Sequence, residues 1–155
     1  MKKTALSLIT LCLLFVSCGK SSQEEWSRFY NFTQNDIVGH YEANPDESLY
    51  EELPTTGVAV YDNATIDIQS SGGNQVSLRI VIPGTINKAF SGTVIPDEDS
   101  SDLMLVNNNE DISMTVYKNS QNQIRLHGRV KRYHYDSHQV LVDSDNWGFD
   151  VLKTE

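Results

Sequence analysis

Cysteine is nearly absent from this chain of 155 residues, which contains only Cys12 and Cys18. The first lies inside an apolar run near the start of the chain, and the second follows that run directly. If the run is removed during export and Cys18 is modified, the folded part of the chain retains no thiol. Disulfides, thiolate catalysis and cysteine-ligated zinc are then excluded together.

Positive charge is also scarce, because 12 lysines and arginines stand against 21 aspartates and glutamates, for a formal net charge of −9. Removal of residues 1–17 takes away Lys2 and Lys3 and changes this charge to −11. A surface with such an excess of negative charge repels phosphate backbones. We therefore expect no nucleic-acid partner.

Helical periodicity is rare after residue 17. Asn44-Pro45-Asp46-Glu47 is typical of a helix start, with a capping Asn, Pro at the first helical position and acids in the first turn. Pro54 would end this helix after one or two turns. No other stretch beyond the opening segment has a convincing helical period.

Short apolar alternations separated by turn residues fill most of the remaining chain. The clearest is Val76, Leu78, Ile80 and Ile82, which share one strand face between the turn residues at 70–74 and Pro83-Gly84. The same pattern predicts strands at residues 36–41, 58–60, 66–68, 76–82, 90–95, 103–106, 112–117, 124–135, 140–142 and 147–152. The prediction is an all-β fold, an antiparallel up-and-down β-barrel, with a β-sandwich as the alternative.

The apolar run at residues 5–16 follows Lys2 and Lys3 and is too short to span a membrane, which takes about 20 residues. It suits an export signal. Phe15-Val16-Ser17-Cys18 resembles the bacterial lipobox, which implies that Cys18 receives diacylglycerol and becomes the new N-terminus. We therefore expect a lipoprotein anchored to the outer membrane, on its surface or its periplasmic face. An ordinary signal peptide is the alternative.

This interpretation divides the chain into a signal peptide at 1–17, a lipidated N-terminus and linker at 18–35, and a domain at 36–155. Two stretches of that domain, 36–41 and 146–151, resemble the first and last strands of the lipocalin-like (calycin-like) lipoproteins of the Bacteroides type. The Gly-x-Trp of the family is matched by Gly39 and by Tyr41, with tyrosine in place of tryptophan.

The resemblance implies a β-barrel that holds an apolar or amphipathic ligand in its mouth. It also implies that Tyr41 packs beneath a basic residue of the final strand, where Lys153 is the basic residue present.

The candidate ligand-binding residues come from a basic and aromatic strand at residues 125–135. Alternation places six side chains on one face: Arg125, His127, Arg129, Lys131, Tyr133 and Tyr135. Leu126, Gly128, Val130, Arg132 and His134 take the other face. We hypothesise that Arg129, Lys131, Tyr133 and Tyr135 hold an acidic glycan or carboxylate ligand, with the tyrosines stacking on a sugar ring, or dock the protein onto an envelope complex. The alternative is a solvated outer face whose cations balance acids on neighbouring strands.

The sequence contains no strong motif for a metal site or for catalysis. His134 and His138 have a spacing that would suit zinc on a helix, but they lie at the end of a predicted strand. The acids at 97–102 do not follow the order of a calcium-binding loop. No Ser/His/Asp order and no Gly-rich phosphate-binding loop stand out in the sequence. We expect a binding protein without a cofactor, a bound metal or catalytic residues.

Overall fold

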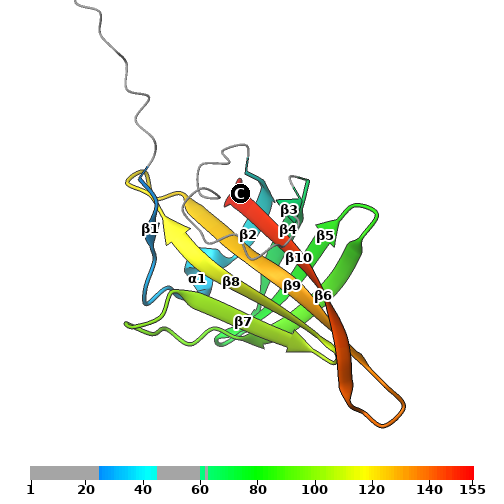
Figure 1. The fold of residues 1–155 in the computed structure, drawn as a ribbon. Helices are drawn as coiled ribbons and strands as arrows, with labels where there is room; N and C mark the ends of the chain where they lie inside the picture. The colour runs from blue at the N-terminus through cyan, green and yellow to red at the C-terminus, as the bar shows by residue number, and fades with distance from the viewer. Residues whose placement is uncertain (1–24, 45–59, 62) are drawn as a thin grey trace, which may run out of the picture.

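The computed structural model describes residues 25–44, 60–61 and 63–155 (Figure 1). These residues form ten strands and one short helix. The elements are β1 (Ser27–Arg28), α1 (Gln34–Ile37), β2 (Gly39–Ala43), β3 (Val60–Tyr61), β4 (Thr65–Gly72), β5 (Gln75–Ile82), β6 (Ile86–Thr93), β7 (Asp102–Asn107), β8 (Glu110–Lys118), β9 (Ile124–Tyr135) and β10 (Leu141–Lys153). The predicted helix after Asn44, the strand residue Val58 and the lipobox with Cys18 lie outside the described residues.

All ten strands belong to one sheet, in the order β1-β8-β9-β10-β2-β4-β5-β6, with β7 paired to β8 and β3 paired in parallel to β10. The other pairings are antiparallel, so the all-β prediction is confirmed. Within the described ranges no strand ladder joins β6 to β7, and the sheet is not closed by backbone pairing. The two edges nevertheless contact each other, because the Asn107 side chain of β7 donates from Nδ2 to the backbone carbonyl oxygen of Ala89 in β6 at 2.7 Å.

The core lies on the face that the alternation of apolar residues predicted. Val76, Leu78, Ile80 and Ile82 of β5 have no exposed surface. They pack with the inward residues of the neighbouring strands in one hydrophobic cluster. Full burial of such a side chain contributes about 1.5–3 kcal/mol. This face therefore fixes the register of the sheet, because a one-residue slip would expose it.

The predicted strand at residues 36–41 is wrong at its start. Gln34–Ile37 is a single helical turn, and β2 begins only at Gly39. The Asp36 carboxylate accepts hydrogen bonds from the backbone nitrogen and the hydroxyl of Thr33, at 2.7 and 2.6 Å. These bonds begin the helix and outweigh the apolar alternation that resembled a strand.

Two predicted strands, 140–142 and 147–152, are one continuous strand. β10 runs through the polar residues between them because each is paired with β9, as at Asp145↔Arg132 and Asn146↔Lys131. β9 and β10 extend beyond the start of β8, whose first residue, Glu110, pairs with Arg132. The hairpin projects past the other strands (Figure 1).

Helix α1 is tied to one end of the sheet. The buried Gln34 donates from Nε2 to the Gln75 carbonyl oxygen at 3.1 Å, beside the turn between β4 and β5. Lys153 of β10 pairs in register with Tyr41 of β2, and its Nζ reaches the Asp36 carbonyl oxygen at 3.0 Å. The absence of a side chain at Gly39 leaves room for the Lys153 side chain, because a Cβ at residue 39 would lie 2.6 Å from Lys153 Cε.

Candidate functional site

At the end of the sheet away from α1, the inner face changes from apolar to charged. Phe90, Ile112 and Val130 are buried core residues of β6, β8 and β9. The residues two positions nearer this end, on the same strand faces, are Lys88, Glu110 and Arg132. Charged side chains therefore border the core at this end of β6, β8 and β9, whereas Ile82 of β5 and Ile86 of β6 remain buried core residues there.

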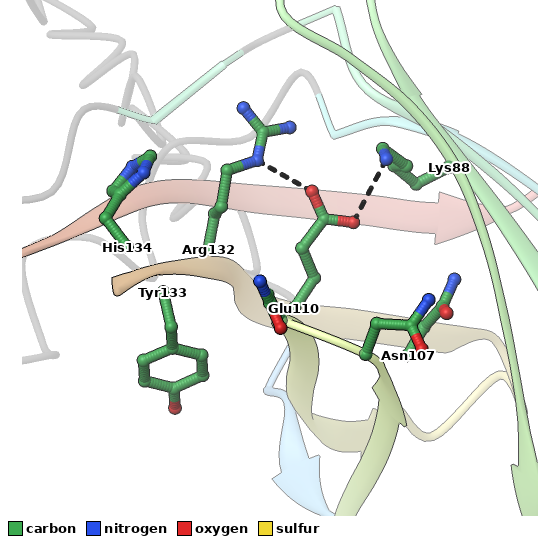
Figure 2. Close-up of a pocket in the computed structure, with 8 residues that line it drawn as sticks. Lys88, Asn107, Glu110, Arg132, Tyr133 and His134 are labelled. Atoms are coloured by element: carbon green, nitrogen blue, oxygen red, sulfur yellow. Dashed lines mark hydrogen bonds and ion pairs between the residues drawn. The ribbon is translucent and has the colours of Figure 1, made fainter. Parts of the chain in front are cut away.

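The three charged residues form a connected group (Figure 2). Glu110 is buried, and its Oε1 accepts a hydrogen bond from Arg132 Nε at 2.7 Å. Its other carboxylate oxygen lies 3.4 Å from Lys88 Nζ. Lys88 and Arg132 carry two positive charges against one negative charge, in a chain whose net charge is −9. The group is therefore a local site of positive charge on an acidic protein.

Arg132 is held in place by a second contact. Its guanidinium carbon lies 4.9 Å from the centre of the Trp147 ring, a distance typical of stacking between a cation and an aromatic ring. Because Arg132 uses Nε to reach Glu110, its two terminal nitrogens point away from that carboxylate (Figure 2). Those nitrogens have the fork geometry that recognises carboxylate and phosphate groups.

This charged group borders a pocket of about 350 Å³. The residues that line the pocket are polar or charged: Lys88, Asn107, Asn108, Asn109, Glu110, Arg132, Tyr133 and His134. Asn107 is the last residue of β7, and Asn108 and Asn109 form the turn to β8, where Asn108 adopts a left-handed conformation with φ of 52°. The pocket therefore offers amide groups beside cations.

The four residues predicted to bind a ligand lie on the opposite face of β9. Arg129 is exposed, and it pairs in register with Ser113 on one side and Gly148 on the other. Lys131 Nζ lies 4.8 Å from the centre of the Tyr133 ring. Tyr135 is exposed near the end of β9. Among these four, Lys131 and Tyr133 are in direct contact, and Arg129 and Tyr135 lie near enough to Tyr133 to affect its electrostatics.

An acid on β8 also takes part in this outer cluster. The Tyr133 hydroxyl donates a hydrogen bond to Asp111 Oδ2, and Asp111 pairs in register with Lys131. The hydrogen bond to Asp111 raises the pKa of Tyr133, so this tyrosine stays protonated. Lys131 on β9 therefore lies opposite Asp111 on β8. The alternative interpretation of β9, a solvated outer face whose cations balance acids on neighbouring strands, predicts such a pair.

Arg125 also belongs to the predicted basic face, but it is fully buried. It donates from Nε to Asp150 Oδ1 at 2.7 Å and forms an ion pair with the same carboxylate. His127 Nδ1 lies 3.5 Å from Asp150, and Trp26 covers the Arg125 guanidinium at 5.6 Å. Burial would raise the pKa of Asp150, but hydrogen bonds from His127 and Arg125 hold it below its ordinary value. This cluster joins β9 to β10 inside the protein.

The histidine pair considered for a metal has two separate carboxylate partners. His134 Nε2 lies 2.8 Å from Asp145, and His138 Nδ1 lies 3.8 Å from Asp136. In the part of the chain that the structure describes, no three or more histidine, cysteine or acidic residues are grouped to hold a metal ion. The same residues include no helix long and apolar enough to cross a membrane.

The pocket is not evident from the sequence. Strand alternation did place Arg132 and His134 on the same face as Leu126 and Val130. The charged side chain of Arg132 on this otherwise apolar face was the one feature of the sequence that pointed to the pocket. Lys88 and Glu110 carried no such signal, because they lie in other strands and meet Arg132 only through the sheet register.

Comparisons with protein-family models, with curated proteins and with solved structures found no match for this chain.

Proposed function

We propose that this chain is a lipid-anchored envelope protein without enzymatic activity, which holds a small glycan in the pocket beside Arg132. The observation that carries the proposal is a polar pocket of about 350 Å³. It lies above the core, in which the inward side chains of β5 (Val76, Leu78, Ile80 and Ile82) are completely buried. Binding pockets for small molecules measure about 300–1,000 Å³, and this one lies at the small end. Its amides and charges suit sugar hydroxyls better than an apolar ligand, which would need an apolar lining.

For the fold, we propose a lipocalin-like β-barrel. The side-chain contact of Asn107 with Ala89 supports it, because that contact joins the two sheet edges that closure requires. A second support is the pairing of Tyr41 with Lys153, the aromatic and the basic residue that the resemblance brings together. Helix α1 would close one end of this barrel, and the pocket would form its mouth.

The proposed anchor is the lipid on Cys18, in the outer membrane. Strand β1 pairs with the end of β8 at Ser27↔Lys118, whereas the pocket lies at the other end of β8, at Glu110. The anchored domain would therefore approach the membrane with its α1 end and turn the pocket mouth away from the lipid. This orientation suits capture of a soluble ligand.

Calorimetric titration of the full-length protein, in a non-ionic detergent without a sugar headgroup, tests the proposed ligand class. The titrants are a panel of neutral and acidic mono- and disaccharides, with a fatty acid such as palmitate as the apolar probe. We expect at least one sugar to bind with one-to-one stoichiometry. Binding of palmitate in the absence of any sugar binding would refute a glycan site.

Incorporation of labelled palmitate into the expressed chain tests the anchor. We expect label in the wild type and none in Cys18→Ala, which should leave the membrane fraction, since stable anchoring depends on acyl chains. Equal labelling of the two proteins would contradict the anchor at Cys18.

A second candidate function is docking to an envelope complex through the hairpin of β9 and β10. The observation that favours it is a run of exposed apolar residues at the projecting tip: Tyr135, Val140, Leu141 and Val142. Exposed apolar side chains grouped in this way mark interaction sites.

Co-purification from detergent-solubilised membranes tests the docking function. The variant Val140→Asp/Val142→Asp, which replaces two exposed apolar side chains of the tip, should lose a partner that the wild type retains. Arg79→Glu, on the outer face of β5, is the matched control. An unchanged set of partners in the double variant would remove this candidate.

A further inference from the structure

We propose that the ligand of the pocket is a sugar bearing one carboxylate, such as a uronic acid, and that Lys88 and Arg132 bind the carboxylate. This inference rests on the proposed function, which it narrows from a small glycan to an acidic one. Its basis is the arrangement of the two cations about one buried carboxylate at the pocket wall.

Glu110 sets the charge that the ligand must carry. Its carboxylate is buried and takes a contact from each cation, through Arg132 Nε and Lys88 Nζ. These two cations and one carboxylate leave a single positive charge in the group of three side chains. Asp145, which pairs in register with Arg132 and lies 2.8 Å from His134 of the pocket lining, adds a negative charge beside it. A ligand with no more than one anionic group therefore suits this wall. A phosphate with two negative charges would exceed that balance and would be repelled by Glu110 in a partly desolvated site.

Arg132 sets the geometry of recognition. Trp147 supports its guanidinium plane from one side, and the contact with Glu110 uses only Nε. The terminal nitrogens that point away from Glu110 form the edge that binds a carboxylate with two parallel hydrogen bonds (Figure 2). Because both supports come from the protein, the fork is oriented before the ligand arrives, which lowers the entropic cost of binding.

The remaining lining selects a sugar over a simple carboxylic acid. Asn107 donates its Nδ2 to the Ala89 carbonyl oxygen, which fixes the side chain. Asn108 and Asn109 supply further amide groups on the same turn. Amides both donate and accept hydrogen bonds, as the hydroxyls of a sugar ring require. A ring with a carboxylate on one side can meet the cations and the amides together.

Calorimetric titrations of the full-length protein with glucuronate, galacturonate, glucose and glucose 6-phosphate test the inference. We expect one of the uronates to bind at least about tenfold more tightly than glucose and than the phosphate, since charged hydrogen bonds are worth about 1.5–3 kcal/mol. The affinity should fall as salt increases.

Matched variants locate the binding site. Arg132→Gln and Lys88→Met should each weaken uronate binding by about tenfold or more, as expected for the loss of a charged hydrogen bond. Arg79→Gln, whose side chain contacts Asn87 on an exposed surface, should leave it unchanged. Lys88 is partly exposed, so its replacement keeps the test valid even if Arg132→Gln impairs folding.

Uronate binding that survives both pocket variants would overturn the inference, as would a neutral sugar or glucose 6-phosphate that binds as tightly as the uronates. The absence of uronate binding would also overturn it. If neutral sugars then still bound, the proposed glycan function would stand without an acidic ligand. If no sugar bound, both proposals would fall.

Discussion

At the scale of single residues, the pair of Arg125 and Asp150 is an ion pair whose disruption is costly. Both side chains are buried, so loss of either partner leaves an uncompensated charge inside the protein. We expect Asp150→Asn to lower the free energy of unfolding by about 3–5 kcal/mol at neutral pH. Urea denaturation measures this change. A cost below about 1 kcal/mol, the range of surface pairs, would show that the pair is not structurally important.

His40 gives the fold a dependence on pH. Its Nδ1 lies 2.6 Å from Asp67 and its Nε2 lies 3.6 Å from Glu42, and the hydrogen bond to Asp67 raises the pKa of His40 above 6.5. A raised pKa in the folded state stabilises the protein below the pKa of the unfolded chain, and that stability is lost as pH rises through the folded pKa.

Thermal unfolding should therefore occur at a lower temperature as pH increases from about 6 to about 8, and His40→Gln should reduce this slope. Melting curves of the two proteins across that range measure the effect. An identical slope in the variant would assign the pH dependence to another group. Asp67→Asn, which removes the partner instead of the histidine, should reproduce the reduced slope.

At the scale of secondary-structure elements, β8 and β9 approach closely at Gly128. A Cβ at this position would lie 2.2 Å from the Ser113 carbonyl oxygen and 2.7 Å from Met114 Cα. Because these atoms belong to the backbone, the strands must separate to accept a methyl group. We expect Gly128→Ala to lower the free energy of unfolding by about 1–3 kcal/mol, the usual cost of overpacking.

Gly92 provides the control for this prediction. Its added Cβ would meet Leu105 Cδ2 at 2.3 Å, which is the far end of a flexible side chain. Gly92→Ala should therefore cost less than Gly128→Ala in the same denaturation experiment. If the two variants were equally stable, the strands at Gly128 would not be packed as closely as described.

The sequence predicted the strands well where apolar and other residues alternate without interruption. β9 begins and ends at the predicted residues, Ile124 and Tyr135, and the inward residues of β5 are as expected. The helical turn at α1 was missed because its start depends on Asp36 capping Thr33, a local contact that overrides periodicity. The prediction split β10 into two strands because the polar residues in its middle interrupt the apolar alternation. They belong to the strand through their pairing with β9, which the sequence pattern does not show.

The candidate site was harder to predict than the strands. Alternation correctly assigned Arg132 to the inner face of β9, but no sequence spacing relates it to Lys88 or Glu110. Glu110 meets Arg132 through strand register, and Lys88 reaches the same carboxylate from β6. Such a site depends on the three-dimensional path of the sheet, which local patterns do not specify.

At the scale of the whole molecule, the two ends of the sheet have different properties. One end carries α1, β1 and the Lys153 contact, and the other carries the polar pocket and the projecting hairpin. With a lipid on Cys18, the first end would face the membrane and the second would face the solvent. The protein would then present its binding surfaces to molecules outside the lipid layer.

The central claim is that a small acidic glycan binds in the pocket rather than on the outer face of β9. Mapping of amide chemical shifts in the full-length, isotopically labelled protein during titration with the best-binding uronate tests this claim most directly. We predict that the largest shifts fall at Lys88, at Asn107 through Glu110, and at Arg132, the residues of the pocket. Shifts concentrated at Arg129, Lys131 and Tyr135, with an unchanged pocket, would contradict the claim.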